Sequence, residues 1–345
     1  MSNFSIDTPS EFINALVHGW WANGASGSRL EELARCGTVD NLLRQLQSLG
    51  IIEAGVSNDA VLHSLLVRQY RKLDRLAHLS DSTTQPFYAA LKEALQNENI
   101  KMILNYRFFP ERVGKASDML IPFPNAPQSA SQISAIVEAP TTDQFTMLLC
   151  RGNTALPQLR QIIKRLEEDH DIMRAENAID NIGFAKTIAA VANLRGNARD
   201  AINELMRRMT DCANAITLLR NASFYHLEPK DMEAAWVEGG ELIHHHLWQT
   251  LAAEHDRNAV LAALPAPLTS VMAAQNTDSV AVLENRLHRQ ILRQARRYFT
   301  DSTAPELAGI VYPIMLHFET INLSRVYEGI RFSLPVATIM EMVVA

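Results

Sequence analysis

Apolar residues recur three and four positions apart along most of the 345-residue chain, which is the spacing of one face of an α-helix. The pattern is clearest in residues 31–50, 59–79, 157–194 and 279–299. Alternating runs rich in Val, Ile and Thr, which would indicate strands, are scarce. We therefore predict an all-α protein.

One helical pattern occurs three times. Each copy has an asparagine, apolar residues one, four and five positions after it, and a phenylalanine ten positions after it. The asparagines are 115 and 108 residues apart, each close to a third of the chain. The three copies contain Asn99 and Phe109, Asn214 and Phe224, and Asn322 and Phe332.

A second element recurs in the same order, upstream of each asparagine. Residues 38–46 resemble residues 141–149 and, more faintly, residues 255–264. Two elements that repeat in register indicate a repeat architecture, and its period of about 110 residues is far longer than the ~33–47 residues of helical solenoids. The chain is accordingly predicted to contain three helical units, residues 1–113, 114–227 and 228–345.

Composition limits the partners and the compartment. The formal charge of −6 argues against nucleic acid as a principal partner, because phosphate binding depends on clustered Lys and Arg. The three cysteines, Cys36, Cys150 and Cys212, are far apart and predict reduced thiols. There is no apolar run long enough to span a bilayer and no visible secretory signal. We expect a cytoplasmic protein that reaches a membrane only through a partner.

Catalytic signatures are weak. The sequence has no GxxxxGK[ST], GxGxxG or GxSxG motif, so nucleotide hydrolysis and serine hydrolase chemistry have no support. A helical metalloenzyme is the alternative, because Glu167 with His170 and Glu241 with His244 have the Glu-x-x-His spacing that would share a helix face in di-iron sites. Those sites need further inward carboxylates, and the first pair lies in a densely charged stretch. We expect no enzyme activity, cofactor or metal ligand.

The stretch from residue 283 to residue 299 predicts an amphipathic helix with a basic face. Leu283, Leu287 and Ile291 lie on one side, and arginines follow three- and four-residue steps on another. Such a face is usually solvated or paired in salt bridges, and it is also the best candidate for contact with an acidic partner. Its arginines are Arg286, Arg289, Arg293, Arg296 and Arg297.

Residues 214–242 resemble the family of C (or d) subunits of V-type and archaeal-type rotary ATPases. They contain an asparagine, the triplet Leu218-Leu219-Arg220, an aromatic step, a short predicted helix and the pair Gly239-Gly240. Residues 283–299 and 318–332 look like the closing repeat of that family, and residues 12–22 like its N-terminal helix. The chain departs from the family pattern at Leu16 and His18, where basic residues are usual, and the first repeat lacks the Gly-Gly pair.

The resemblance implies a non-catalytic protein of three similar lobes that form a funnel with pseudo-threefold symmetry. In that family the funnel sits on the cytoplasmic side of a membrane-embedded proteolipid ring and receives the foot of the central axle, so the expected partners are the axle subunits and the ring. Arg289, Arg293, Arg296 and Arg297 would help to hold the axle. An unrelated helical scaffold, without the funnel, is the remaining alternative.

Structural roles are expected for the repeated residues. A buried helical asparagine usually hydrogen-bonds to backbone groups at a helix end or bend. The three phenylalanines are predicted to lie in the core with Leu218 and Leu219. Arg220 should pair with a carboxylate, because an unpaired buried guanidinium is very costly.

Overall fold

The computed structural model describes residues 9–110, 120–124, 130–149, 156–272, 279–301 and 303–344. All regular elements in these ranges are helices, and no strand occurs among them, so the predicted all-α class is confirmed. Cys150 and the predicted boundary between residues 113 and 114 lie outside the described residues.

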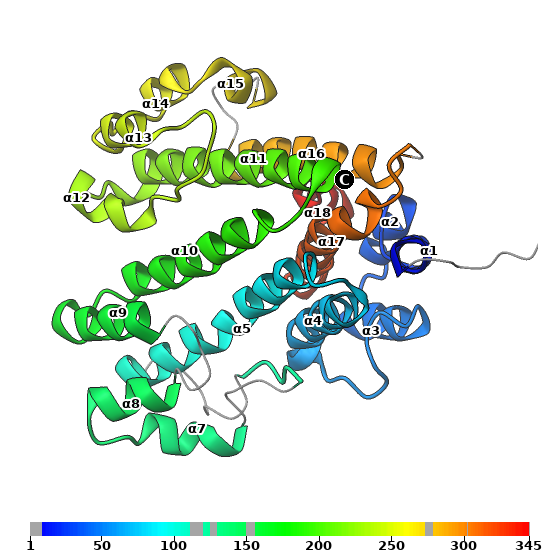
Figure 1. Cartoon of the computed structure of the whole chain (residues 1–345), viewed down its shortest axis with the longest axis horizontal. Coiled ribbons are helices and arrows are strands. Elements are labelled where there is room, and N and C mark those ends of the chain that lie inside the picture. Colours follow the sequence, from blue (N-terminus) through cyan, green and yellow to red (C-terminus); the bar gives the residue numbers. More distant parts are fainter. Residues whose placement is uncertain are drawn as a thin grey trace, which may run out of the picture.

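Six long helices form a closed circuit. Each one packs against the next, and the last packs against the first (Figure 1). In chain order they are α4 (Val61–Leu79), α5 (Gln85–Phe108), α10 (Ile172–Val191), α11 (Gly196–Arg220), α16 (Val280–Phe299) and α17 (Leu307–Arg331). The repeated asparagines lie on α5, α11 and α17, the second, fourth and sixth members of the circuit.

Shorter helices surround the circuit in three groups. The first group, α1 (Pro9–Ala22), α2 (Ser28–Ala34), α3 (Val39–Ser48) and α18 (Val336–Met342), packs on α17. The second, α7 (Ala130–Val137), α8 (Thr142–Leu149) and α9 (Leu156–Asp169), lies by α5 and α10. The third lies by α10, α11 and α16 and contains α12 (Pro229–Met232), α13 (His245–Ala252), α14 (Arg257–Ala263) and α15 (Ala266–Met272).

Three short turns complete the described elements. η1 (Asn58–Ala60) and η4 (Glu233–Ala235) are 3-10 turns. η3 (Asn221–Tyr225) is a π-helical turn that continues α11.

The second sequence repeat corresponds to a capped helix start. The Thr38 hydroxyl accepts from the backbone N–H of Asn41 at the start of α3, and Thr141 accepts in the same way from Gln144 at the start of α8. At the start of α14, the Asp256 carboxylate accepts from the N–H of Asn258. Each side chain satisfies a backbone donor that has no partner within its helix, which is why these residue types recur there.

The stretch of residues 157–194 is two helices, although its apolar pattern runs through without interruption. α9 ends at Asp169, and His170 has a left-handed backbone with φ of 56°. Asp171 then caps α10 by accepting from the N–H of Arg174. The cap next to the break favours a new helix over continuation of the old one.

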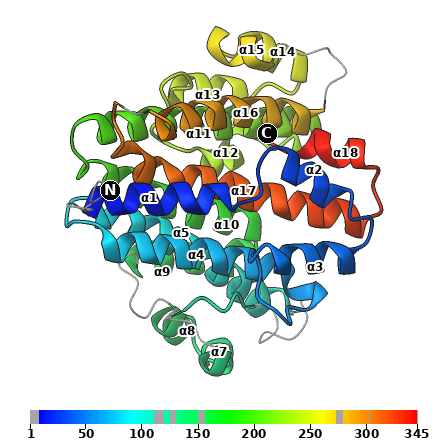
Figure 2. The same ribbon diagram turned by 90° about the vertical axis from the view of Figure 1, so that its right-hand side faces the viewer.

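The two ends of the chain share one hydrophobic core. Residues of α2 and α3, near the N-terminus, pack in a single cluster with the last turns of α17 and with α18. Figure 2 shows α1 lying along α4 and α17, with α2 beside α18. The first and last segments are therefore joined by packing as well as by the circuit.

Candidate functional site

The three repeated asparagines make the same pair of hydrogen bonds. In each, the side-chain Nδ2 donates to a backbone carbonyl 22 or 23 residues downstream, and the side-chain Oδ1 accepts from the N–H of the same residue. The partners of Asn99, Asn214 and Asn322 are Ile121, Val237 and Val344, at distances from 2.6 to 3.1 Å. All three asparagines are buried. We call this arrangement the asparagine clamp. It bonds to backbone groups, as expected for a buried helical asparagine, and it positions a segment 22 or 23 residues downstream against the helix.

The phenylalanines do not share one role. Phe109 is buried in the core formed with α7, α8 and α9. Phe224 and Phe332 are 65% and 67% exposed, so their predicted place in the core is wrong. Phe109 and Phe332 both stand directly after a helix, at the C-caps of α5 and α17, so position along the helix does not separate them. Phe109 is buried because residues of α7, α8 and α9 pack around it.

The Leu-Leu-Arg triplet joins two helices of the circuit. Leu218 and Leu219 are buried in the main core. Arg220 is partly exposed, and its guanidinium lies 2.8 Å from the carboxylate of Glu284 on α16. The pair lies across the contact between α11 and α16.

A buried acid lies three positions before two of the asparagines. Asp211 on α11 accepts from the backbone N–H groups of Glu241, Leu242 and Ile243. A Cβ at Gly240 would overlap the Asp211 carboxylate. Gly240 therefore lets the backbone approach the acid, since a side chain there would occupy the place of the carboxylate.

Glu319 is the counterpart of Asp211 on α17. It is buried, accepts from the N–H of Ala25 at 2.7 Å and pairs with Arg68 of α4 through both guanidinium nitrogens. A Cβ at Gly24 would lie 2.7 Å from its carboxylate. The N-terminal segment (residues 20–25) thus contacts a buried acid of α17 in the same way that the Gly-Gly segment (residues 236–243) contacts a buried acid of α11: a glycine packs against the carboxylate, and the next backbone N–H donates to it.

This pair of acid sites was not predicted from the sequence, although a signal exists. Trp20 precedes Gly24 by four positions, and Trp236 precedes Gly240 by the same number. The segment at residues 236–240 follows Asn214, whereas the segment at residues 20–24 precedes the first repeated asparagine, Asn99. The two therefore do not occupy matching places in the order of the sequence repeats.

A half-buried cluster surrounds Trp20. The Lys72 ammonium donates to the Tyr312 hydroxyl at 2.7 Å and lies 5.2 Å from the Trp20 ring centroid. Burial, with the nearby charge of Arg68, lowers the pKa of Lys72 to about 7. Burial also raises the pKa of Tyr312, so the phenol stays protonated.

The predicted arginine face is divided among several contacts. Arg289 donates to the carbonyl of Val343, and Arg296 lies 5.7 Å from the Trp21 ring centroid. Arg293 and Arg297 are exposed and line a cavity of about 640 Å³ with Glu204. Of the four candidate interface arginines, these two are the exposed ones, whereas Arg289 and Arg296 are half-buried.

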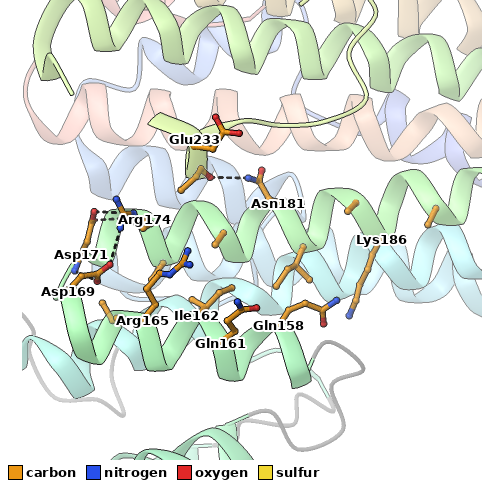
Figure 3. Close-up of a pocket in the computed structure, with 17 residues that line it drawn as sticks. Gln158, Gln161, Ile162, Arg165, Asp169, Asp171, Arg174, Asn181, Lys186 and Glu233 are labelled. Carbon is orange, nitrogen blue, oxygen red and sulfur yellow. Dashed lines mark hydrogen bonds and ion pairs between the residues drawn. The ribbon is translucent and has the colours of Figure 1, made fainter. Parts of the chain in front are cut away.

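A cavity of about 660 Å³ lies between α9, α10 and η4 (Figure 3). Its floor is largely apolar, with Ala178 and Ile182 of α10 among the lining residues. Two of its polar groups are engaged within the lining: Arg174 pairs with Asp169, and Asn181 donates to the carbonyl of Ala234.

The Glu-x-x-His pairs are not on shared helix faces, which corrects that prediction. His170 follows the end of α9, and the Glu167 carboxylate accepts from Thr142. Glu241 precedes α13 outside any helix, and His244 is the N-cap of α13. Within the described ranges, no group of three or more His, Cys, Asp or Glu side chains is arranged to hold a metal ion.

None of the described helices combines the length and the apolar character that crossing a bilayer requires.

Comparison with known proteins identifies the family. No curated protein matches the chain at a significant level. The family model described as ATP synthase (C/AC39) subunit matches residues 13–342. The match covers all three repeated asparagines, both buried acids and the Gly-Gly pair. The chain therefore belongs to the ATP synthase (C/AC39) subunit family.

Proposed function

We propose that this protein is a non-catalytic socket of a V-type or archaeal-type ATPase, which couples the central axle to the proteolipid ring. The observation that carries the proposal is the asparagine clamp, which occurs three times, with partners 22 or 23 residues downstream, on alternate helices of the circuit. Three equivalent units around an axis make a round socket, and a round socket is the shape that can cap a ring of identical subunits.

The three units are proposed to be residues 1–113, 114–227 and 228–345, arranged as lobes of a funnel with pseudo-threefold symmetry. The contact of Gly24 and Ala25 with Glu319 favours one refinement. The N-terminal segment completes the third lobe, as the Gly-Gly segment completes the second. The funnel is then closed by contacts between the first and last lobes.

A part that transmits torque must resist separation of its lobes under load. The Arg68–Glu319 pair joins α4 to α17, and the Arg220–Glu284 pair joins α11 to α16. Packing of α2 and α3 with α17 and α18 adds apolar contacts at the closure. These contacts support a rigid coupling role that needs no active site.

The partners in this proposal are the axle subunits and the cytoplasmic loops of the ring, so the protein would be cytoplasmic and peripheral to the membrane. Arg293 and Arg297 are the exposed members of the proposed basic interface. Arg289 and Arg296 would support it from their contacts with Val343 and Trp21.

Deletion of the gene tests the coupling role. Membrane vesicles from the deletion strain should lose ATP-driven ion pumping, and a plasmid copy of the gene should restore it. The ATPase heads should still hydrolyse ATP after release from the membrane, because that chemistry belongs to another part of the complex. Normal pumping without this protein would refute the proposal.

Double charge reversal, Arg293→Glu with Arg297→Glu, tests the basic interface. The double variant should bind the axle more weakly, and the difference from the wild-type chain should shrink as the salt concentration rises, because salt screens the interaction between exposed charges. The matched control is Arg199→Glu, another exposed arginine, at the start of α11. Unchanged affinity in the double variant would remove these arginines from the interface.

A further inference from the structure

The cavity of about 640 Å³ lined by Arg293 and Arg297, here called the arginine cavity, lies between α11 and α16. Figures 1 and 2 show α16 lying along α11. Every described residue of its lining has a charged or polar side chain, whereas the cavity between α9, α10 and η4 has a largely apolar floor. The lining consists of Glu204, Arg208, Gln290, Arg293, Gln294, Arg297 and Tyr298. The arginine cavity therefore suits a ligand that is itself polar or charged.

Positive charge exceeds negative charge in this lining. It contains three arginines and one acid, which leaves two positive charges in excess. The acid, Glu204, is engaged, because its carboxylate accepts from Arg208 at 2.9 Å and from the Tyr298 hydroxyl. Within the described part of the chain, the guanidinium groups of Arg293 and Arg297 make no ion pair or hydrogen bond. The excess charge thus lies on these two arginines.

Arg293 and Arg297 belong to a longer row. With Arg289 they stand four residues apart along one side of α16, over a length of about 12 Å. Arg289 lines an adjoining cavity of about 500 Å³, which shares Gln290 and Arg293 with the first. It donates to the carbonyl of Val343 at 2.9 Å, a neutral partner that leaves its charge in place.

The row repels itself. Like charges four positions apart destabilise a helix, and residues 285–299 contain no aspartate or glutamate that would separate the arginines. An anion that lies along the row relieves this repulsion. The side chain of Gln290 lies beside it, has no hydrogen-bond partner among the described residues and offers two further N–H donors.

The spacing of the row favours linked phosphates. Guanidinium groups match phosphate oxygens in geometry and charge, and each phosphate accepts several hydrogen bonds. A single phosphate is too small to contact arginines spread over about 12 Å, whereas a chain of phosphates places negative charge along that length. The volume of the arginine cavity lies within the range of about 300–1,000 Å³ that is usual for small-molecule sites.

We propose that the arginine cavity binds a free anion of several linked phosphates, held by Arg289, Arg293 and Arg297 with Gln290. Inorganic tripolyphosphate and nucleoside triphosphates share this chemistry. Because the described lining has no wholly apolar side chain, the site recognises the phosphate chain and offers no pocket for a base.

The bound anion regulates attachment of the axle. It occupies Arg293 and Arg297, the two exposed arginines that the proposed function assigns to the axle interface. Anion and axle therefore exclude each other, and axle binding weakens as the concentration of free phosphate chains rises. This consequence rests on the proposed function, whereas binding of the anion does not.

Isothermal titration calorimetry of the full chain with inorganic tripolyphosphate tests the site. The wild-type chain should bind it, and the affinity should fall as the salt concentration rises. Arg293→Gln with Arg297→Gln should weaken binding at least about tenfold, because the charge-assisted hydrogen bonds are lost. The matched control is Arg199→Gln, at an exposed site at the start of α11, which should leave the affinity unchanged. Circular dichroism of each variant checks that it is folded.

Two further probes identify the recognised group. Inorganic phosphate should bind at least about tenfold more weakly than tripolyphosphate, because it contacts fewer arginines. ATP should bind about as tightly as tripolyphosphate, because the phosphate chain is common to both. Equal affinity for single and linked phosphates, or much tighter binding of ATP than of tripolyphosphate, would overturn the proposal of a phosphate-chain site.

Competition with the purified axle subunit of the same organism tests the regulation, at constant ionic strength. Tripolyphosphate at about ten times its Kd should weaken axle binding to the wild-type chain about tenfold, by mass action. Unchanged axle binding would show that the two ligands do not share Arg293 and Arg297, and the regulation would be wrong.

The possible results separate this proposal from the socket. If tripolyphosphate does not bind, or binds the double variant as tightly as the wild-type chain, the phosphate site is wrong and the socket stands. If the wild-type chain does not bind the axle even without tripolyphosphate, the socket is wrong, and the calorimetry with tripolyphosphate alone still decides the phosphate site.

Discussion

At the scale of single residues, the asparagine clamp explains why this residue type recurs. An amide side chain carries both a donor and an acceptor, so one asparagine can satisfy the N–H and the C=O of one backbone residue. The sequence located the three asparagines by their shared spacing. Their partners could not be predicted, because Ile121, Val237 and Val344 share no distinctive side chain and the bonds are to backbone atoms.

Asn214→Ala should lower the free energy of unfolding by roughly 2–4 kcal/mol, because it leaves a donor and an acceptor of Val237 without partners. Urea unfolding followed by circular dichroism measures the change. The control is Asn193→Ala, at an exposed site with one local bond of 3.3 Å, where a change of a few tenths of a kcal/mol is expected. Equal losses in both variants would contradict the clamp.

Lys72 should make stability rise with pH. Its pKa is about 7 in the folded protein and ordinarily 10.5, so between these values the unfolded chain binds more protons. The free energy of unfolding should therefore increase as pH rises from about 7, by at most about 1.4 kcal/mol per pH unit from this group. Lys72→Met should flatten the slope, and Lys164→Met, at an exposed site on α9, should not. The same slope in wild type and Lys72→Met would show that Lys72 keeps an ordinary pKa.

At the scale of elements, helix cores were more predictable than helix ends. The apolar stretches at residues 59–79 and 279–299 correspond to α4 and α16. Residues 31–50, however, are divided between α2 and α3, and residues 157–194 are interrupted at His170. Phe224 and Phe332, which were predicted to lie in the core, are exposed. The spacing of apolar residues indicates which face of a helix is buried, but it does not indicate where the helix ends. The caps and left-handed residues that stop it depend on backbone geometry that the period does not contain.

The Gly-Gly turn is predicted to be the most substitution-sensitive connection. Gly240→Ala should destabilise the protein by roughly 1–3 kcal/mol, because the new Cβ displaces the Asp211 carboxylate from its backbone donors. Thermal unfolding of the purified variant measures the loss. Gly19→Ala is the control, since a Cβ there meets nothing within 4 Å and α1 should gain up to about 1 kcal/mol. A neutral Gly240→Ala would show that Asp211 does not need this close approach.

At the scale of the whole molecule, the sequence predicted three units but not how the circuit closes. The N-terminal segment lies against Glu319 in the way that the Gly-Gly segment lies against Asp211. That equivalence joins the beginning of the chain to its last long helix. It was not predictable from repeat order, because the segment lies near the start of the sequence and packs in space against the last long helix, α17.

Glu319→Ala tests the closure. It removes a buried carboxylate from Arg68 and from the Ala25 N–H, so the free energy of unfolding should fall by roughly 3–5 kcal/mol. Protease sensitivity near α1 and α2 should rise with it. The control is Glu328→Ala, further along α17. Its ion pair with Arg331, one turn on, is partly exposed and is expected to contribute less than about 1 kcal/mol. A mild effect of Glu319→Ala would mean that packing alone closes the circuit.

The coupling role is tested most directly by isolating the tagged full-length protein from detergent-solubilised native membranes and identifying its companions by mass spectrometry. The account predicts stoichiometric recovery of the axle subunits, the proteolipid and the ATPase heads, with the proteolipid retained at low detergent. Recovery of the protein without any of these subunits would contradict the proposal that it is the socket between axle and ring.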